Sequence, residues 1–219
     1  SVSLIYGGTG SGSVKADDAV SLQDALKEVF GEESVNPTLT KMYNRATKYR
    51  RVNADTTGGS QLQYRINELP WSEYTENGLN SIKDYGDVAL IVLSRSGGEG
   101  ADLPSGIPEL SEYLTDGDYL RLCKEEIDML EHIEALKKDG TIKKVVVLLN
   151  SSNALQLDFL DKYGIDAVLW IGDVGMTGTR GVADILSGAV SPSGRVTERR
   201  LTQLLKAPTP RAETESGIR

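Results

Sequence analysis

Three short, almost uninterrupted apolar runs constrain the fold of this chain most strongly. They occupy residues 87–94 (DVALIVLS), 144–149 (KVVVLL) and 167–171 (AVLWI). A strand with one face in water alternates apolar and polar residues, whereas a strand covered on both faces is apolar throughout. The runs therefore predict strands of a mostly parallel sheet with helices on both faces. Residues 2–6 are predicted to form a further strand.

Helical patterns lie between these runs. Residues 21–30 place Leu22, Ala25, Leu26 and Val29 on one face, with Ser21 as the N-cap and Gly31 as the stop signal. Residues 118–138 predict the longest helix, and residues 155–163 and 181–186 predict shorter ones. Because strands and helices alternate, the sequence predicts an α/β fold, a three-layer α/β/α sandwich with a mostly parallel sheet.

The domain limits follow from composition. Residues 1–205 are expected to form one domain, in which residues 50–69 make a polar excursion with one strand at 61–66. Residues 206–219 contain two prolines and almost no apolar side chains, which predicts a disordered tail or a linker. The chain starts directly in a strand-like run, which suggests that it was cut from something longer.

Charge and composition exclude several classes of partner. The net charge is −8 and no basic stripe interleaved with aromatic residues occurs, so nucleic acid and anionic membrane surfaces are poor candidates. No apolar run approaches the roughly 20 residues that cross a bilayer. Localisation stays open, because a targeting segment could have been removed. The cytoplasm is slightly favoured, since these residues contain no signal peptide or transmembrane segment. The single cysteine, Cys123, is expected to be a buried helix residue.

The first glycine-rich loop, GGTGSGSV at residues 7–14, lacks both common phosphate-binding motifs. Ser13 stands where a dinucleotide fingerprint starting at Gly8 needs its third glycine, and no Gly-Lys-Ser or Gly-Lys-Thr follows. Both nucleotide motifs therefore fail. What remains is a loop with exposed amides and hydroxyls at the carboxyl end of a strand, where α/β sheets bind ligands. A purely structural turn explains this loop equally well.

The second glycine-rich loop, SGGEGADLP at residues 96–104, follows the strongest predicted strand. Partial desolvation or a second carboxylate would raise the pKa of Glu99 and make it a proton donor. A retaining glycosidase also needs a nucleophilic carboxylate roughly 5 Å away. Asp102 is the nearest candidate, but it could equally cap the turn before Pro104. On residue chemistry alone, a merely solvated Glu99 is the better-supported interpretation.

The sequence supports neither a metal site nor a catalytic serine. The only histidine, His132, lies in a charged helical segment and is expected to be a solvated surface residue. Without a second histidine or further cysteines, no structural zinc site is expected. No Gly-x-Ser-x-Gly elbow is present either.

Several motifs together resemble a known family. The segments IYGGTGSGSV, SLQDALKEVFG, DYGDVALIVLSRSGGEGADLP, KKVVVLLNSSNALQLDFLD and IDAVLWIGDVGMTGTRGVADILSGAVSPSGRV occur in this order. They are similar to the carboxy-terminal α/β sandwich domain of family 3 glycoside hydrolases, the β-glucosidase group. The resemblance runs from about residue 5 to residue 196 and so covers most of the chain.

The resemblance implies a site shared between two domains. In the family a (β/α)8 barrel supplies an aspartate nucleophile, and the loop that matches SGGEG supplies the general acid/base, which here is Glu99. The loop that matches GGTGSG borders the same cleft, so Ser11, with Thr9 and Gly10, is a candidate sugar contact. The implied partners are a β-glucoside or short oligosaccharide and the barrel domain of the same full-length chain. No cofactor and no metal are implied.

The nucleophile is then expected outside these 219 residues, and the fragment alone is expected to be inactive. Two other classes remain as alternatives. In a noncatalytic binding module, the same loops would hold a sugar or other small ligand without chemistry. A flavodoxin-like signalling or nucleotide domain is weakened by the failed phosphate motifs.

Overall fold

In the described part of the chain, the sheet contains three parallel strands, arranged in the order β1-β2-β3. The computed structural model describes residues 4–7, 14–45, 68–95, 108, 111 and 115–194. Within these residues the strands are β1 (Val88–Arg95), β2 (Lys144–Ser151) and β3 (Ala167–Trp170). β1 and β2 pair along their full lengths, from Val88 opposite Lys144 to Arg95 opposite Ser151. The three strands predicted from the apolar runs are therefore confirmed, and all of them run parallel.

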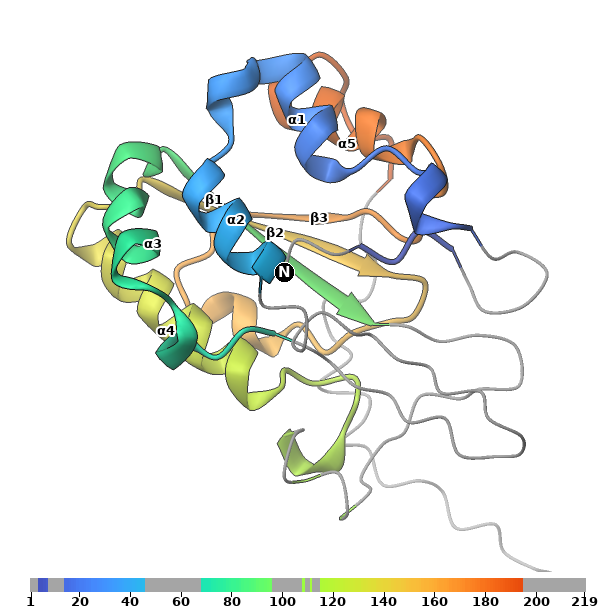
Figure 1. Cartoon of the computed structure of the whole chain (residues 1–219). Coiled ribbons are helices and arrows are strands. Elements are labelled where there is room, and N and C mark those ends of the chain that lie inside the picture. Colours follow the sequence, from blue (N-terminus) through green and yellow to red (C-terminus); the bar gives the residue numbers. More distant parts are fainter. Residues whose placement is uncertain are drawn as a thin grey trace, which may run out of the picture.

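Helices cover both faces of the sheet (Figure 1). One face packs against α1 (Leu22–Phe30) and α5 (Gly178–Ser187), and the other against α4 (Lys124–Lys138), with α3 (Glu76–Ser81) beside it. Alternate β1 side chains enter different cores: Leu93 joins the α4 side and Val92 the α1 side. This burial on both faces explains the continuous apolar runs, and it confirms the three-layer α/β/α sandwich.

The predicted ends of α1 are confirmed. The Ser21 hydroxyl accepts a hydrogen bond from the Asp24 amide at 3.1 Å, and Gly31 takes a φ of 96° at the carboxyl end. We expect Ser21→Ala to destabilise the fold by about 1 kcal/mol, because an amide of the first turn loses its acceptor. Urea unfolding measures this change. Ser21→Thr keeps a hydroxyl and should fall closer to the parent, whereas equal losses in both variants would contradict the capping role.

Three predicted elements differ from the structure. The helix expected at residues 118–138 begins at Lys124, because the carbonyls of Tyr119 and Arg121 accept hydrogen bonds from the side chain of Arg95 instead. The helix expected at residues 155–163 is only one 3-10 turn, Asp158–Asp161, and the Gln156 amide donates to the Leu120 carbonyl. Residues 4–6 do not form a strand; Ile5 bonds to a side chain of β2.

Two helices were not predicted: α2 (Pro37–Arg45) and α3. Asn36 caps α2, since its side-chain oxygen accepts from the amides of Thr38 and Leu39, both at 3.0 Å. The other helical elements of the described residues are single 3-10 turns: Ala16–Asp18, Glu32–Ser34, Trp71–Glu73, Ile82–Tyr85 and Thr115–Gly117. The strand expected at residues 61–66 and the tail expected at 206–219 lie outside the described residues.

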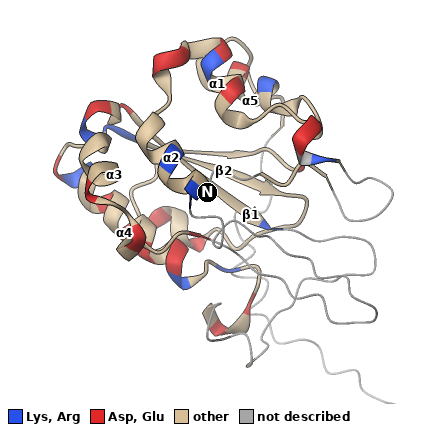
Figure 2. Ribbon diagram, viewed as in Figure 1, with Lys and Arg blue, Asp and Glu red and all other residues tan. Residues whose placement is uncertain are grey.

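Charged residues gather on the helices and their connections, whereas the strands carry them only at their ends (Figure 2). Cys123 is buried, as expected, although it directly precedes α4 instead of lying inside it. The His132 side chain is 44% exposed and its ring stacks on Trp71. No group of residues suited to a metal ion occurs in the described part of the chain. Among those residues, no helix is long and apolar enough to cross a membrane.

Candidate functional site

Buried polar residues line the carboxyl edge of the sheet. β1 ends in Ser94 and Arg95, and β2 ends in Asn150 and Ser151, each no more than 8% exposed. The two pairs lie opposite one another in the β1-β2 register. The strands are parallel, so the segments that follow them leave from this same edge. Polar side chains in so buried a position need hydrogen-bond partners, and these partners fix the neighbouring chain.

Asn150 joins three segments at this edge. Its side-chain oxygen accepts from the Ile5 amide at 2.6 Å and the Ser94 hydroxyl at 2.9 Å. Its side-chain nitrogen donates to the carbonyls of Ile5 at 2.9 Å and Gly172 at 2.7 Å. One buried amide thus holds the segment that enters the first glycine-rich loop, the end of β1 and the segment after β3.

We expect Asn150→Asp to destabilise the fold by about 2 kcal/mol. The substitution keeps the shape but places an oxygen against two carbonyl oxygens, which leaves buried polar groups without donors. Asn153→Asp is the matched control, because its side-chain amide makes no hydrogen bond to the described residues. Chemical denaturation compares the two variants; a loss for Asn153→Asp as large as for Asn150→Asp would contradict the junction.

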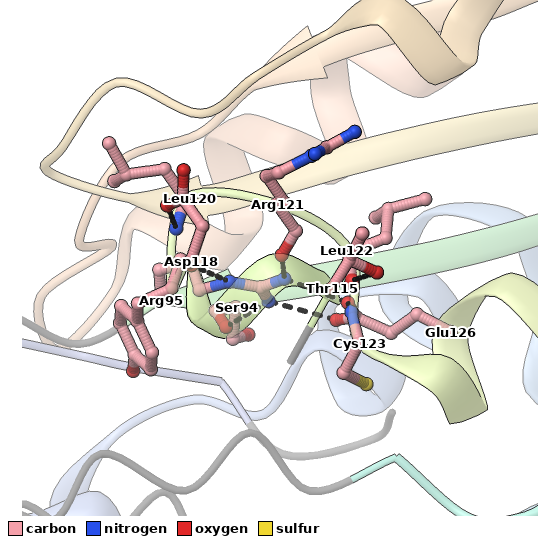
Figure 3. Close-up of polar contacts among 10 residues, drawn as sticks. Ser94, Arg95, Thr115, Asp118, Leu120, Arg121, Leu122, Cys123 and Glu126 are labelled. Carbon is pink, nitrogen blue, oxygen red and sulfur yellow. Dashed lines mark hydrogen bonds and ion pairs between the residues drawn. The ribbon is translucent and has the colours of Figure 1, made fainter. Parts of the chain in front are cut away.

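Arg95 anchors the end of β1 from which the second glycine-rich loop departs (Figure 3). Its side chain is 1% exposed and forms a bidentate pair with Glu126 of α4, at 2.8 and 2.7 Å. Its other donors reach the main-chain carbonyls of Ser94, Tyr119 and Arg121, at 2.9, 2.8 and 2.7 Å. The five N–H donors of the guanidinium are therefore matched by five acceptors.

The electrostatics of this buried cluster favour a charged pair. Burial pulls the pKa of Arg95 down, but the charge and hydrogen bonds of Glu126, with smaller contributions from Cys123 and Tyr119, together outweigh burial, and the net pKa is raised. Glu126 also accepts from the Cys123 amide at 2.9 Å. Burial, followed by the negative charge of Glu126, raises the pKa of the Cys123 thiol well above its usual value. The thiol therefore stays neutral, and Arg95 and Glu126 form a structural clamp.

In the sequence, the predicted site residues follow the two segments that Arg95 and Asn150 hold in place. Glu99 and Asp102 come after Arg95, and Thr9, Gly10 and Ser11 come after Gly7; all five lie outside the described residues. The structure brings together what precedes the two loops, because Ile5 and Ser94 both bond to Asn150. Sequence reasoning missed Arg95, Glu126 and Asn150. The available signal was an arginine at the end of an apolar run, where burial requires an anionic partner.

Comparison with known proteins identifies the family. A family model described as "Glycosyl hydrolase family 3 C-terminal domain" matches residues 3–213. The chain belongs to this family. As a family 3 C-terminal domain it carries the α/β sandwich that the motifs predicted, and the resemblance drawn from those motifs is confirmed.

Curated relatives and solved structures agree with this assignment. A β-glucosidase of Ruminococcus albus is 33% identical over 110 residues, which are 50% of this chain and 10% of the relative. The β-glucosidase cel3A of Pyricularia oryzae is 30% identical over 133 residues, 58% of this chain and 16% of the relative. The matched segments therefore make up less than a fifth of either curated relative.

Solved β-glucosidases share its fold. β-Glucosidase 3B of Thermotoga neapolitana, solved in complex with glucose, superposes with a TM-score of 0.64 at 28% identity. That match covers 88% of this chain and 24% of the solved chain. A β-glucosidase from Paenibacillus barengoltzii gives a TM-score of 0.66 at 25% identity and covers 88% of this chain and 19% of its own.

Proposed function

We propose that this family 3 domain is the accessory domain of a retaining β-glucosidase that hydrolyses terminal, non-reducing β-D-glucosyl residues. The observation that carries the proposal is the Asn150 junction, which holds the approach to the GGTGSG loop and the end of β1 at one rigid point. Two loops that leave from adjacent anchors are suited to opposite sides of a single sugar site. The names of the relatives supply the substrate class.

In the proposed mechanism Glu99 acts as general acid and then as general base. It first protonates the leaving glycosidic oxygen while an aspartate of the barrel domain attacks the anomeric carbon. The ionised Glu99 then takes a proton from the water that hydrolyses the glycosyl-enzyme. The Arg95–Glu126 clamp supports this role, because Glu99 is only four residues beyond the buried guanidinium. Covalent geometry keeps their Cα atoms within about 14 Å of each other.

The remaining predicted residues bind the substrate. Ser11, with Thr9 and Gly10, contacts sugar hydroxyls through its side chain and the loop amides. The proposed domain ends near residue 205, and residues 206–219 serve as a tail or linker. The (β/α)8 barrel that supplies the nucleophile belongs to the same full-length polypeptide.

Separating the domain from its barrel tests the division of labour. We expect the 219-residue chain alone to release no glucose from cellobiose above the buffer rate, and the full-length protein to turn over. The physical reason is that, without a nucleophilic carboxylate, the covalent glycosyl-enzyme intermediate cannot form. Turnover by the purified chain would contradict the proposal. Tight binding of glucose or cello-oligosaccharides by the chain alone, measured by calorimetry, would instead favour a noncatalytic module.

A further inference from the structure

A single buried side chain joins the two ends of the segment that carries Glu99. The segment leaves β1 at Arg95, and the chain returns to α4 through residues 115–123. The Arg95 guanidinium donates to the carbonyl of Tyr119 at 2.8 Å and to that of Arg121 at 2.7 Å (Figure 3). The end of β1 is therefore fixed to residues 24 and 26 positions further along the chain, at the neck of this segment.

The returning end is also ordered independently of Arg95. The Thr115 hydroxyl donates to the Leu122 carbonyl at 2.8 Å. The Asp118 carboxylate accepts from the Leu120 amide at 2.9 Å and from the Gln156 side chain at 3.2 Å. The Gln156 amide in turn donates to the Leu120 carbonyl at 3.0 Å. Because Gln156 follows β2 in the chain, Arg95 binds to a partner that is itself tied to the segment after the next strand.

Packing alone does not call for an arginine at this position. Ile91 and Leu93 belong to the core on the α4 side, and Arg95 follows them with the period of two that places strand residues on one face. An aliphatic side chain would extend this core without burying a charge, and such replacements of buried ion pairs are often neutral or stabilising. What the guanidinium adds is direction, because its five hydrogen bonds reach five fixed acceptors.

We propose that Arg95 is a positioning residue for the acid/base Glu99 and that Glu126 holds Arg95 in the required orientation; the inference rests on the proposed function. An acid must lie within hydrogen-bond reach of the glycosidic oxygen, and a displacement of about 1 Å can lower the rate about 100-fold. Of the three residues between Arg95 and Glu99, two are glycines, which have no side chain to anchor them. The position of Glu99 therefore depends on how firmly the two ends of its segment are joined.

Arg95→Lys in the full-length protein tests the proposal. Lysine keeps the positive charge beside Glu126, but its three donors cannot serve five acceptors that match a planar guanidinium. We expect kcat/KM for cellobiose to fall about 10–100-fold, because the acid is misplaced. For dinitrophenyl β-glucoside, whose leaving group departs without protonation, kcat/KM should stay within about threefold of the parent.

The ratio of these two constants separates positioning from stability. Both are measured on one preparation, so the ratio does not depend on the fraction of enzyme that is folded, and a poorly folding variant still gives an answer. Arg180→Lys is the matched control, because Arg180 forms a bidentate pair with Glu28 on the exposed surface. This control should leave the ratio unchanged. An unchanged ratio in Arg95→Lys would overturn the positioning role.

Combining Arg95→Lys with Glu99→Gln shows whether Arg95 acts through Glu99. In the Glu99→Gln background, Arg95→Lys should lower kcat/KM for cellobiose by less than about twofold, since the carboxyl group that it positions is already absent. A further loss as large as in the parent background would overturn the inference and leave the proposed function intact. An unchanged ratio in the single Glu99→Gln variant would contradict the proposed function, and the inference with it.

Discussion

Replacing Glu126 with leucine is expected to lower the free energy of unfolding by about 3–5 kcal/mol, because it leaves the guanidinium of Arg95 charged and unpaired in the interior. Arg95 cannot escape the penalty by losing its proton, since an arginine stays protonated in proteins. The variant also removes the acceptor of the Cys123 amide at the start of α4. Urea unfolding, monitored by tryptophan fluorescence and by circular dichroism, measures the loss.

A double-mutant cycle shows whether the loss belongs to the pair. Arg95→Met combined with Glu126→Leu should be destabilised by less than the sum of the two single variants, with a coupling of about 2–3 kcal/mol. The cost will not vanish, since the carbonyls of Ser94, Tyr119 and Arg121 lose their donor. The exposed pair between Arg180 and Glu28 is the control, and Glu28→Gln should change stability far less. Additive single losses at Arg95 and Glu126 would contradict the clamp.

Replacing Glu99 with glutamine in the full-length protein is expected to lower kcat/KM for cellobiose by about 10²–10⁴-fold, the usual contribution of a positioned acid. Glutamine keeps the size of the side chain but has no proton to give to the departing sugar. The alkaline limb of the pH profile, which reports the acid in its protonated form, should disappear in the same variant. Steady-state kinetics between acidic and alkaline pH measure both effects.

Asp102→Asn is the matched control for this experiment. Asp102 lies three residues beyond Glu99 in the same loop sequence and loses the same charge on substitution. If Glu99 is the acid, Asp102→Asn should retain both limbs of the pH profile and most of the activity. Equal losses at the two positions would show that the loop needs negative charge and not a specific proton donor.

The sheet was predictable because burial on both faces leaves a direct mark on composition. The apolar runs around Leu90, Val147 and Leu169 have the length and composition of strands covered from two sides, and the caps Ser21 and Gly31 bounded α1. The start of α4 was not predictable from periodicity. Leu122 fits the helical spacing, but Arg95, distant in sequence, draws the carbonyls of Tyr119 and Arg121 out of any helix.

The anchors of the candidate site were missed for a related reason. Asn150 and Glu126 look like ordinary polar residues in the sequence, and only the fold brings Asn150 against Ile5, 145 positions away. α2 could have been found locally, because Asn36 followed by Pro37 is a common helix start. For Glu99, the local sequence favoured a solvated carboxylate. Only the family motifs, taken in order, pointed to a catalytic role.

The dependence of rate on the leaving group tests the role of Glu99 most directly. A dinitrophenolate departs without protonation, whereas the glucose released from cellobiose needs the acid. For Glu99→Gln in the full-length protein, kcat/KM for dinitrophenyl β-glucoside should stay within about tenfold of the parent, while kcat/KM for cellobiose falls by about 10²–10⁴-fold. A loss of the same size on both substrates would contradict the assignment of Glu99 as the general acid.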